Sequence, residues 1–369
     1  MLYNVLIIGG GLAGLVNSIR LSQAGLSVCV VEKNEYPFHR VCGEYISNET
    51  LPFLKSIGFD PFAHGAVPIE HFWLTSPNGS ELRMPLDLGG FGLSRYLLDE
   101  KLYHLALKQG VDFYLKTNVL EIKKEGEIFS CQTSGKGDLQ AKLVIESHGK
   151  RSNLDKERTF FKKRSPYIGV KYHLKTNFPN DLIALHNFKD GYCGISRIED
   201  DKYCLCYLTT RENLKENGTI EAMEAKVLKK NPFLKEILEN STFLYDAPKV
   251  INEVSFAPKT LIENDILMCG DSAGMIAPLC GNGMAIAIHS AKILSDLVIQ
   301  YFDNQINRQE MYQQYQAKWN EHFKFRLWLG RTVQQFFGNP LLTDTFVSFF
   351  KYSPFLAKQV VKQTHGKEF

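Results

Sequence analysis

The sequence lacks the features that mark membrane-spanning, metal-binding and nucleic-acid-binding proteins. No window offers roughly twenty uninterrupted apolar residues, so no transmembrane helix is expected. The net charge is only +3, which gives no reason to expect a nucleic-acid partner, and short basic runs such as residues 162–164 are typical of solvated faces. The eight cysteines show neither CxxC nor metal-ligand spacing, so no metal site is expected. No signal peptide precedes the first strand, and the cysteines are expected to be free thiols in a reducing cytoplasm, so we expect a cytoplasmic protein.

A dinucleotide-binding pattern is present almost at the N-terminus. A buried run at residues 5–8 predicts the first strand of a parallel sheet, and glycines then fill the three positions of G-x-G-x-x-G. Gly9 allows a tight turn, Gly11 lets the backbone approach a pyrophosphate, and Gly14 lets the following helix pack on its strand. That helix would direct its N-terminal N–H groups and its dipole at the phosphates. The second strand ends at Glu32, where a carboxylate can hydrogen-bond a ribose hydroxyl.

A second glycine-rich segment lies in the C-terminal half. Residues 267–274 read Leu-Met-Cys-Gly-Asp-Ser-Ala-Gly, and after Pro278 the turn Gly281–Asn282–Gly283 opens a predicted helix. Asp271, at the end of a strand, can bind a ribityl hydroxyl. The backbone N–H groups of the turn would suit the N1–C2=O edge of a flavin, where negative charge collects on reduction. An ordinary capped helix start is the alternative, which the N-terminal motif disfavours.

The rest of the chain shows further helical and strand periodicities. The length of 369 residues allows two or three lobes. Residues 69–86 predict a hairpin, and residues 165–210 alternate as an antiparallel sheet with one buried side. The other expected elements are helices at 94–109, 218–240 and 283–301 and strands at 111–122, 128–133, 139–147 and 266–269. The tail beyond residue 308 is expected to be helical.

The chain resembles the FAD-dependent superfamily of the p-hydroxybenzoate hydroxylase fold, which contains aromatic hydroxylases, geranylgeranyl reductases and flavin-dependent halogenases. The resemblance spans nearly the whole chain. It rests on the two glycine motifs and on Arg95 within R-x-x-L-D-x-x-L. In this superfamily that arginine lies near the ribityl and phosphate part of FAD, so the resemblance implies the same place for Arg95. A surface residue at a helix start is the alternative for Arg95.

The segment Arg40–Glu44 is similar to that of geranylgeranyl reductase-like members. By resemblance, Arg40 would neutralise an FAD phosphate and Cys42 would lie near the isoalloxazine. A buried, inert thiol explains Cys42 equally well. The full set of residues expected to bind the cofactor is Gly9, Gly11, Leu12, Ala13, Gly14, Glu32, Lys33, Arg40, Arg95, Val119, Gly270, Asp271, Gly281, Asn282 and Gly283.

Three segments depart from the patterns of individual members. Residues 146–152 (Glu-Ser-His-Gly-Lys-Arg-Ser) replace the Asp-Gly of aromatic hydroxylases, which puts direct use of NADPH in doubt. None of the three tryptophans lies in the W-x-W-x-I-P pattern of halogenases. At residues 192–197 the chain keeps the tyrosine of the reductase segment Y-x-W-x-F-P but not its Trp or Phe-Pro. Tyr192 and Tyr207 are the candidate substrate-binding residues.

The expected fold class is α/β, with an α+β second lobe. A Rossmann-like FAD-binding domain with a parallel sheet would be joined by an antiparallel-sheet substrate domain and a helical C-terminal region. The expected ranges are 1–66, 90–160 and 260–305 for the first, 67–89 and 161–259 for the second, and 306–369 for the third.

The expected function is that of an FAD-dependent oxidoreductase, either a reductase or a monooxygenase, acting on a hydrophobic small molecule with NADPH as the candidate reductant. Alternatives are a flavin-dependent cyclase or isomerase without net redox change, a halogenase, and a flavin-holding accessory protein. In the C-terminal region Phe346, Phe349 and Phe350 have helical spacing, and Pro354 ends that helix. A helix packed on the body is the first interpretation; a lid over a lipophilic tunnel and a surface touching a membrane or carrier protein are the others.

Overall fold

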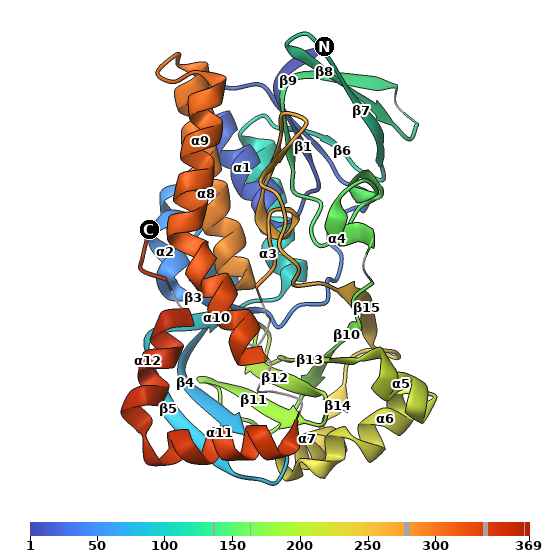
Figure 1. The fold of residues 1–369 in the computed structure, drawn as a ribbon, viewed down its shortest axis with the longest axis vertical. Helices are drawn as coiled ribbons and strands as arrows, with labels where there is room; N and C mark the ends of the chain where they lie inside the picture. The colour runs from blue at the N-terminus through green and yellow to red at the C-terminus, as the bar shows by residue number, and fades with distance from the viewer. Residues whose placement is uncertain (136, 163, 277–280, 335–338, 365) are drawn as a thin grey trace.

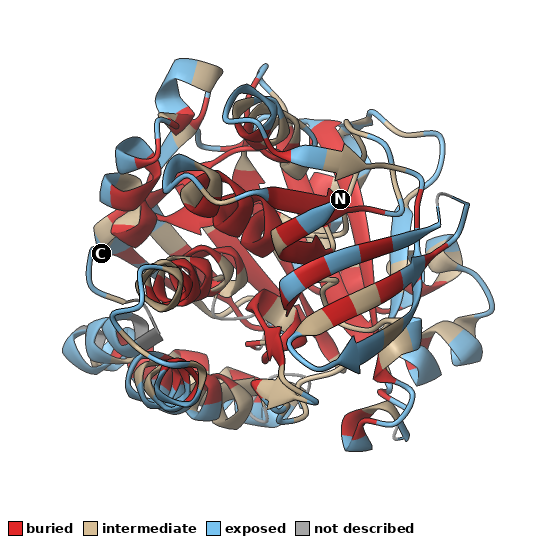
Figure 2. Ribbon diagram, turned by 90° about the horizontal axis from the view of Figure 1, so that it is seen from above, coloured by how far each residue is buried: buried red, intermediate tan, exposed pale blue. Residues whose placement is uncertain are grey.

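The computed structural model describes residues 1–135, 137–162, 164–276, 281–334, 339–364 and 366–369. Pro278, Cys280 and Lys163 therefore lie outside the described residues. Two sheets occupy the two ends of the molecule, and long helices run down one side (Figure 1). Buried residues gather in the strands and on the inward sides of the helices (Figure 2).

The first sheet is mostly parallel, with the order β16-β17-β9-β1-β2-β6. Its central strand β1 pairs in parallel with β2 and β9, so that Val5 lies beside both Val28 and Leu143. The hairpin β7–β8 extends from β9. The strands of this sheet are β1 (Leu2–Ile8), β2 (Val28–Val31), β6 (Asp112–Tyr114), β7 (Val119–Glu125), β8 (Ile128–Thr133), β9 (Asp138–Glu146), β16 (Ile262–Glu263) and β17 (Ile266–Met268). The predicted parallel sheet is confirmed.

Three helices cover the first sheet. Helix α1 packs against both of the others. They are α1 (Leu12–Gln23), α3 (Arg95–Lys108) and α8 (Gly283–Phe302), close to the ranges that the sequence predicted. The predicted strand at 111–122 is instead two strands, because Lys116 turns the chain with a φ of +53° between β6 and β7.

The second sheet is mostly antiparallel, in the order β14-β10-β13-β12-β11-β4-β5-β3, and β15 also pairs with β10. Strands β11 and β4 are parallel neighbours. The strands are β3 (Tyr45–Ser47), β4 (Val67–Thr75), β5 (Glu81–Gly92), β10 (Tyr167–Lys175), β11 (Leu182–Phe188), β12 (Gly191–Arg197), β13 (Tyr203–Thr210), β14 (Thr242–Phe243) and β15 (Lys249–Val254). Strand β3 belongs to this sheet although it lies in the expected 1–66 range; the division into domains stays a prediction.

The expectation that this sheet buries only one side was wrong. Seven consecutive residues of β10, from Ile168 to Leu174, are buried. One face of the sheet packs on residues of α6 (Ile220–Lys226) and α7 (Pro232–Asn240). The other face belongs to a core that includes Val347 and Phe350 of α11 (Pro340–Tyr352). The single predicted helix at 218–240 is instead two helices, separated by a 3-10 turn at residues 228–230 and by Asn231, which caps the second helix before Pro232. A further helix ends before Gly218, whose φ is +82°. The resulting helices are α5 (Arg211–Asn217), α6 (Ile220–Lys226) and α7 (Pro232–Asn240).

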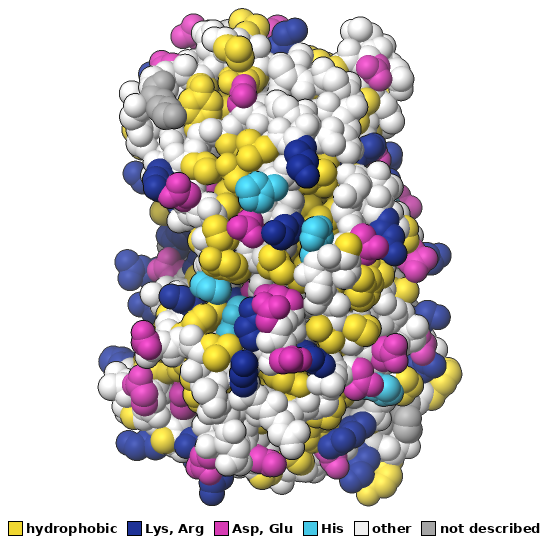
Figure 3. Space-filling view, turned by 180° about the vertical axis from the view of Figure 1, so that it is seen from behind, with side chains coloured by type: hydrophobic (Ala, Val, Ile, Leu, Met, Phe, Trp, Pro, Cys, Tyr) yellow, Lys and Arg dark blue, Asp and Glu magenta, His cyan; other side chains and the backbone are white. Residues whose placement is uncertain are grey.

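The C-terminal tail is helical, as predicted. Helix α9 (Arg308–Trp319) continues through a π-helical turn into α10 (Phe325–Gln334), followed by α11 (Pro340–Tyr352) and α12 (Pro354–Thr364). Two short helices complete the set, α2 (Leu51–Ser56) and α4 (Thr159–Lys162). Among the described helices, none is both long and apolar enough to cross a bilayer. Basic and acidic side chains are interspersed on the face turned away in Figure 1, rather than gathered by sign (Figure 3).

Candidate functional site

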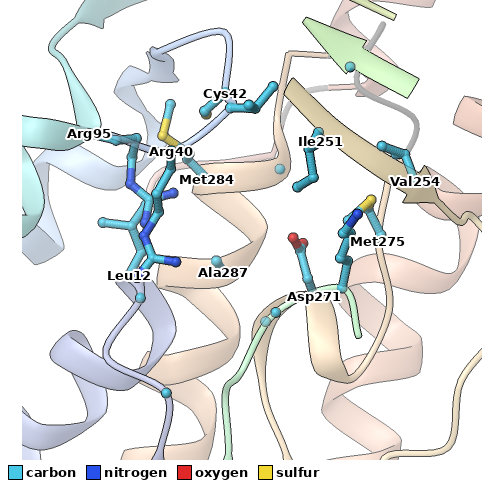
Figure 4. A pocket seen from close by; sticks show the side chains of 18 of the residues that line it. Leu12, Arg40, Cys42, Arg95, Ile251, Val254, Asp271, Met275, Met284 and Ala287 are labelled. Atoms are coloured by element: carbon cyan, nitrogen blue, oxygen red, sulfur yellow. The ribbon is translucent and has the colours of Figure 1, made fainter. Parts of the chain in front are cut away.

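A cavity of about 1090 Å³ lies where the two sheets meet. This volume is slightly larger than the roughly 300–1,000 Å³ typical of small-molecule and cofactor sites. Its walls come from the glycine loop after β1, residues 38–45, the loop after β9, β15, and the segment leading into α8 (Figure 4). Segments far apart in the sequence therefore meet around one space.

Most of the residues predicted to form a site line this cavity. Gly14 and Asn282 do not appear among its lining residues. Those that do are Gly9, Gly11, Leu12, Ala13, Glu32, Lys33, Arg40, Cys42, Arg95, Val119, Tyr192, Tyr207, Gly270, Asp271, Gly281 and Gly283. Their roles toward a ligand stay predictions, but their placement around one cavity is what a shared site requires.

The three glycines of the first motif differ in what restricts them. Gly9 has a φ of +100°, and a Cβ there would lie 2.6 Å from Cα of His148. A Cβ on Gly14 would overlap the carbonyl oxygen of Gly9. Gly11 has ordinary angles, φ −82° and ψ −172°, and a Cβ there would meet nothing closer than 3.9 Å. The fold thus needs Gly9 and Gly14, whereas Gly11 leaves open space on the cavity side.

The open space beside Gly11 is suited to an anion. Helix α1 begins there without a side-chain cap, so its first N–H groups and its positive dipole end are available to a ligand. The atoms nearest to a Cβ on Gly11 would be Nη2 of Arg40 and Nη2 of Arg95, each at 3.9 Å. A pyrophosphate therefore fits this end of the cavity.

Arg40 and Arg95 are held by one buried carboxylate. Asp99 accepts two hydrogen bonds from Arg95, both of 2.7 Å, and one of 3.0 Å from Nε of Arg40. Burial opposes the charge of Arg95, but contact with Asp99 raises its pKa above the ordinary value. The Asp of R-x-x-L-D thus orients two cations rather than facing the cavity itself.

Glu32 connects the glycine loop to the end of β2. Its carboxylate accepts hydrogen bonds from the N–H of Gly10 (2.9 Å) and from the backbone and side-chain nitrogens of Asn34 (3.0 and 2.8 Å). Nη2 of Arg40 lies 3.4 Å away. A carboxylate offers about four acceptor positions. Glu32 lines the cavity, but these four contacts already occupy those positions, so a ribose hydroxyl would have to replace one of them.

Asp271 approaches the cavity from the opposite side. Its carboxylate points into the cavity in Figure 4. Burial raises the pKa of Asp271, while Lys259, Arg95 and Arg40 act to lower it. Nζ of Lys259 donates to the backbone oxygens of Asp271 and Lys150, at 2.7 and 2.8 Å, which fixes the loop. This geometry fits the predicted contact with a ribityl hydroxyl.

Toward the other end one wall of the cavity is apolar, although Lys150, Arg151 and Lys249 also line the cavity. Figure 4 shows Ile251, Val254 and Met275 on the side away from Arg40 and Arg95. Leu185, Tyr192 and Leu208, which also line the cavity, pack in one core with these three residues. Tyr207 also borders the cavity, but its hydroxyl donates to Glu224 at 2.8 Å and so is not directed at a substrate.

Cys42 lines the cavity without being activated. Burial raises the pKa of its thiol, although Arg95 acts in the opposite direction. A thiol in this state is protonated at neutral pH and is a poor nucleophile. The structure therefore favours a packing role for Cys42, whether or not a flavin ring lies beside it.

A buried charge cluster that the sequence did not predict lies in this wall, centred on Glu44. Glu44, with a φ of +57°, accepts hydrogen bonds from the N–H of Arg95 (2.8 Å) and Nζ of Lys171 (2.5 Å). Nε2 of His173 lies 2.6 Å from its other oxygen. Nζ of Lys171 also donates to the carbonyl of Arg40 at 3.0 Å. The cluster thus ties the 40–44 loop to β10 and to the start of α3.

The charges of this cluster depend on one another. Burial alone would raise the pKa of Glu44, but Lys171 and His173 lower it to about 2. The side chain of Lys171 is 0% exposed, and burial opposes its positive charge. Contact with Glu44 nevertheless raises the pKa of Lys171 above the ordinary value. The only sign of this cluster in the sequence was Lys171, a lysine within an otherwise buried strand. The expectation that one side of the sheet faces solvent concealed this sign, because an exposed lysine needs no partner.

Lys171→Met should lower the free energy of unfolding by about 3–5 kcal/mol, because it leaves the Glu44 carboxylate buried without its main partner. Adding Glu44→Gln should recover part of this loss. Urea denaturation at neutral pH measures both variants. A loss below about 1 kcal/mol, the range of exposed pairs, would contradict this account. In the wild type, the contribution of the Glu44 carboxylate to the free energy of unfolding is complete above pH 4.5 and is lost as the pH falls toward 2.

Comparisons with known proteins identify the family of this chain. A model of the FAD binding domain family matches residues 2–320. Conditioned medium factor receptor 1 of Dictyostelium discoideum is 23% identical, over 99% of this chain and 77% of that protein. Digeranylgeranylglycerophospholipid reductase of Methanococcus vannielii is 23% identical, over 88% of this chain and 84% of that protein. The solved structure of the flavin-dependent brominase Bmp2 has the same fold, with a TM-score of 0.81 and 18% identity over 99% of this chain and 93% of that one.

The match to the family model covers most of the chain, and the residues of the cavity fit the cofactor that the family binds. The chain belongs to the FAD binding domain family and has the p-hydroxybenzoate hydroxylase fold.

Proposed function

We propose that this protein is an FAD-dependent oxidoreductase that acts on a hydrophobic small molecule. The observation that carries the proposal is that one cavity joins two chemically different ends. One end has a helix N-terminus and two arginines, and the other is lined by aliphatic side chains and Met275. A dinucleotide cofactor needs the first end, and an apolar substrate needs the second.

Bound FAD would supply the redox chemistry, and the chain would bind, orient and exclude water. The N–H groups of α1, with Arg40 and Arg95, would hold the pyrophosphate. Glu32 would accept a ribose hydroxyl and Asp271 a ribityl hydroxyl. The apolar wall would hold the reacting carbon and keep water away from it. Among these residues, no side chain is placed as a general base, so the chain contributes by positioning.

Within this class we favour a reductase over a monooxygenase. The segment Arg40–Glu44 resembles that of geranylgeranyl reductases, and several of the relatives are digeranylgeranylglycerophospholipid reductases of 22–23% identity. Residues 146–152 lack the Asp-Gly of aromatic hydroxylases, so we propose that the electrons come from a donor other than NADPH. A cytoplasmic location stays a prediction.

The purified protein should be yellow and release FAD on denaturation, which chromatography identifies. In the absence of oxygen, dithionite should bleach the flavin readily and NADPH only slowly. Release of FMN or of a nicotinamide nucleotide would contradict the cofactor assignment. Rapid bleaching by NADPH followed by fast reoxidation in air would favour the monooxygenase instead.

Gly11→Val should abolish FAD binding while leaving the apoprotein as stable as the wild type. The backbone angles at Gly11 suit any residue, but the new side chain would occupy the space for the pyrophosphate. Gly14→Ala is the matched comparison, because its Cβ would overlap the carbonyl of Gly9 and should lower the melting temperature of the apoprotein. Full FAD occupancy in Gly11→Val would contradict this reading of the motif.

Cys42→Ser should alter the rate of flavin reduction or turnover much more than Cys131→Ser. A misplacement of about 1 Å beside the reacting atoms can cost on the order of 100-fold in rate. Cys131 is a matched control, since it is a buried thiol on β8 outside the cavity lining. Stopped-flow reduction and reoxidation measure the effect. Equal rates in the wild type and Cys42→Ser would remove Cys42 from the site.

A further inference from the structure

The C-terminal helices expose an unusual amount of apolar surface. Sixteen large hydrophobic side chains are exposed among the described residues, and half of them lie within residues 325–356. They are Phe325, Trp328, Leu341, Leu342, Phe349, Tyr352, Phe355 and Leu356. Single exposed apolar residues are ordinary, but a concentration of this kind marks a surface that contacts something else.

Helix α11 is apolar on both of its sides. Val347 and Phe350 face inward and pack in the core beside β5. Leu341, Phe349 and Tyr352 have helical spacing on the outer side and are 77%, 54% and 84% exposed. A surface helix of a globular protein normally carries polar residues on the side that faces solvent. The outer side of α11 therefore has the composition of a contact face.

We propose that the outer face of α10, α11 and α12 docks on a membrane surface that contains anionic lipid. The charges of this region complement such a surface. Residues 320–369 contain seven basic and three acidic side chains. Two of the basic ones pair with carboxylates outside this range, Arg326 with Glu49 and Lys358 with Asp87, which leaves a surplus of two. Lys324, Lys351 and Lys362 are exposed, and within the described residues they make no ion pair. Aromatic and aliphatic side chains together with lysines are typical of helices that lie in the plane of the lipid interface.

A second copy of the chain fits this face less well than lipid does. Lysine is depleted in the core of protein–protein interfaces, and two copies would bring surfaces of the same sign together. Each lysine near an anionic membrane instead gains roughly 1 kcal/mol of attraction.

The same helical layer covers the apolar end of the cavity. Val347 and Phe350 of α11 belong to one core with Leu185, Leu208 and Val254, which line the cavity. The face proposed to touch lipid and the apolar wall of the cavity are thus two sides of one layer. The docking itself does not rest on the proposed redox chemistry.

Trp328 is a built-in reporter for this proposal. It is 53% exposed on α10, whereas Trp73 and Trp319, which complete the three tryptophans, are buried. Phosphatidylcholine vesicles containing phosphatidylserine and brominated acyl chains should quench and blue-shift the tryptophan emission of the full chain. Vesicles of phosphatidylcholine alone should do so less. Trp328→Phe should remove the change while vesicle co-sedimentation persists.

Phe349→Ser should lower vesicle partitioning by about tenfold, because it removes a large apolar side chain from the contact. Leu120→Ser is the control, since Leu120 is similarly exposed but lies on β7 of the first sheet. It should bind vesicles like the wild type, and both variants should keep the wild-type melting temperature.

Three results would overturn the proposal. One is the absence of co-sedimentation with the anionic vesicles, and another is equal binding by Phe349→Ser and the wild type. The third is vesicle binding without quenching of Trp328, because α10 would then lie outside the contact. Light scattering that shows a dimer dissociated by Phe349→Ser, without vesicle binding, would assign this face to a second copy instead.

Discussion

Buried charge has to be neutralised where the two sheets meet, and the rest of the site depends on how this is done. Asp99 holds Arg40 and Arg95, and Glu44 is held by Lys171 together with His173. Each carboxylate is 1% exposed or less, so either one unpaired would be costly. Because these pairs join the 40–44 loop to α3 and β10, they also fix the wall of the cavity.

This arrangement divides the cavity into a cofactor end and a substrate end. The cofactor end is built from backbone N–H groups and arginines that are held in place before any ligand binds, which limits the entropy lost on binding. The substrate end is built from strands of the second sheet, β15 among them, and one face of this sheet shares a core with α11. Of the segments that depart from the patterns of individual members, residues 146–152 adjoin the glycine loop through the bond from Ser147 to the carbonyl of Gly9, and residues 192–197 lie on β12 of the second sheet.

The cofactor end could be predicted from the sequence because its residues are close together in the chain and follow fixed spacing. Gly9, Gly11 and Gly14 with Glu32 form one βαβ unit, and Arg95 begins a helix of recognisable pattern. The Glu44–Lys171 pair could not be predicted, because its members are 127 residues apart and meet only through tertiary packing. The expectation of a half-solvated second sheet failed for the same reason. One face is covered by α6 and α7, which closely follow β13, but the other is covered by α11, which is remote in sequence, so strand alternation alone could not reveal the second cover.

The central claim is that FAD lies with its pyrophosphate between Gly11, Arg40 and Arg95 and its ring toward the apolar wall. A crystal structure of the protein with FAD tests this most directly. The account predicts pyrophosphate oxygens within hydrogen-bonding distance of the N–H groups at the start of α1, and the isoalloxazine near Cys42 and Ile251. A cofactor bound outside this cavity, or with its ring at the glycine loop, would contradict it.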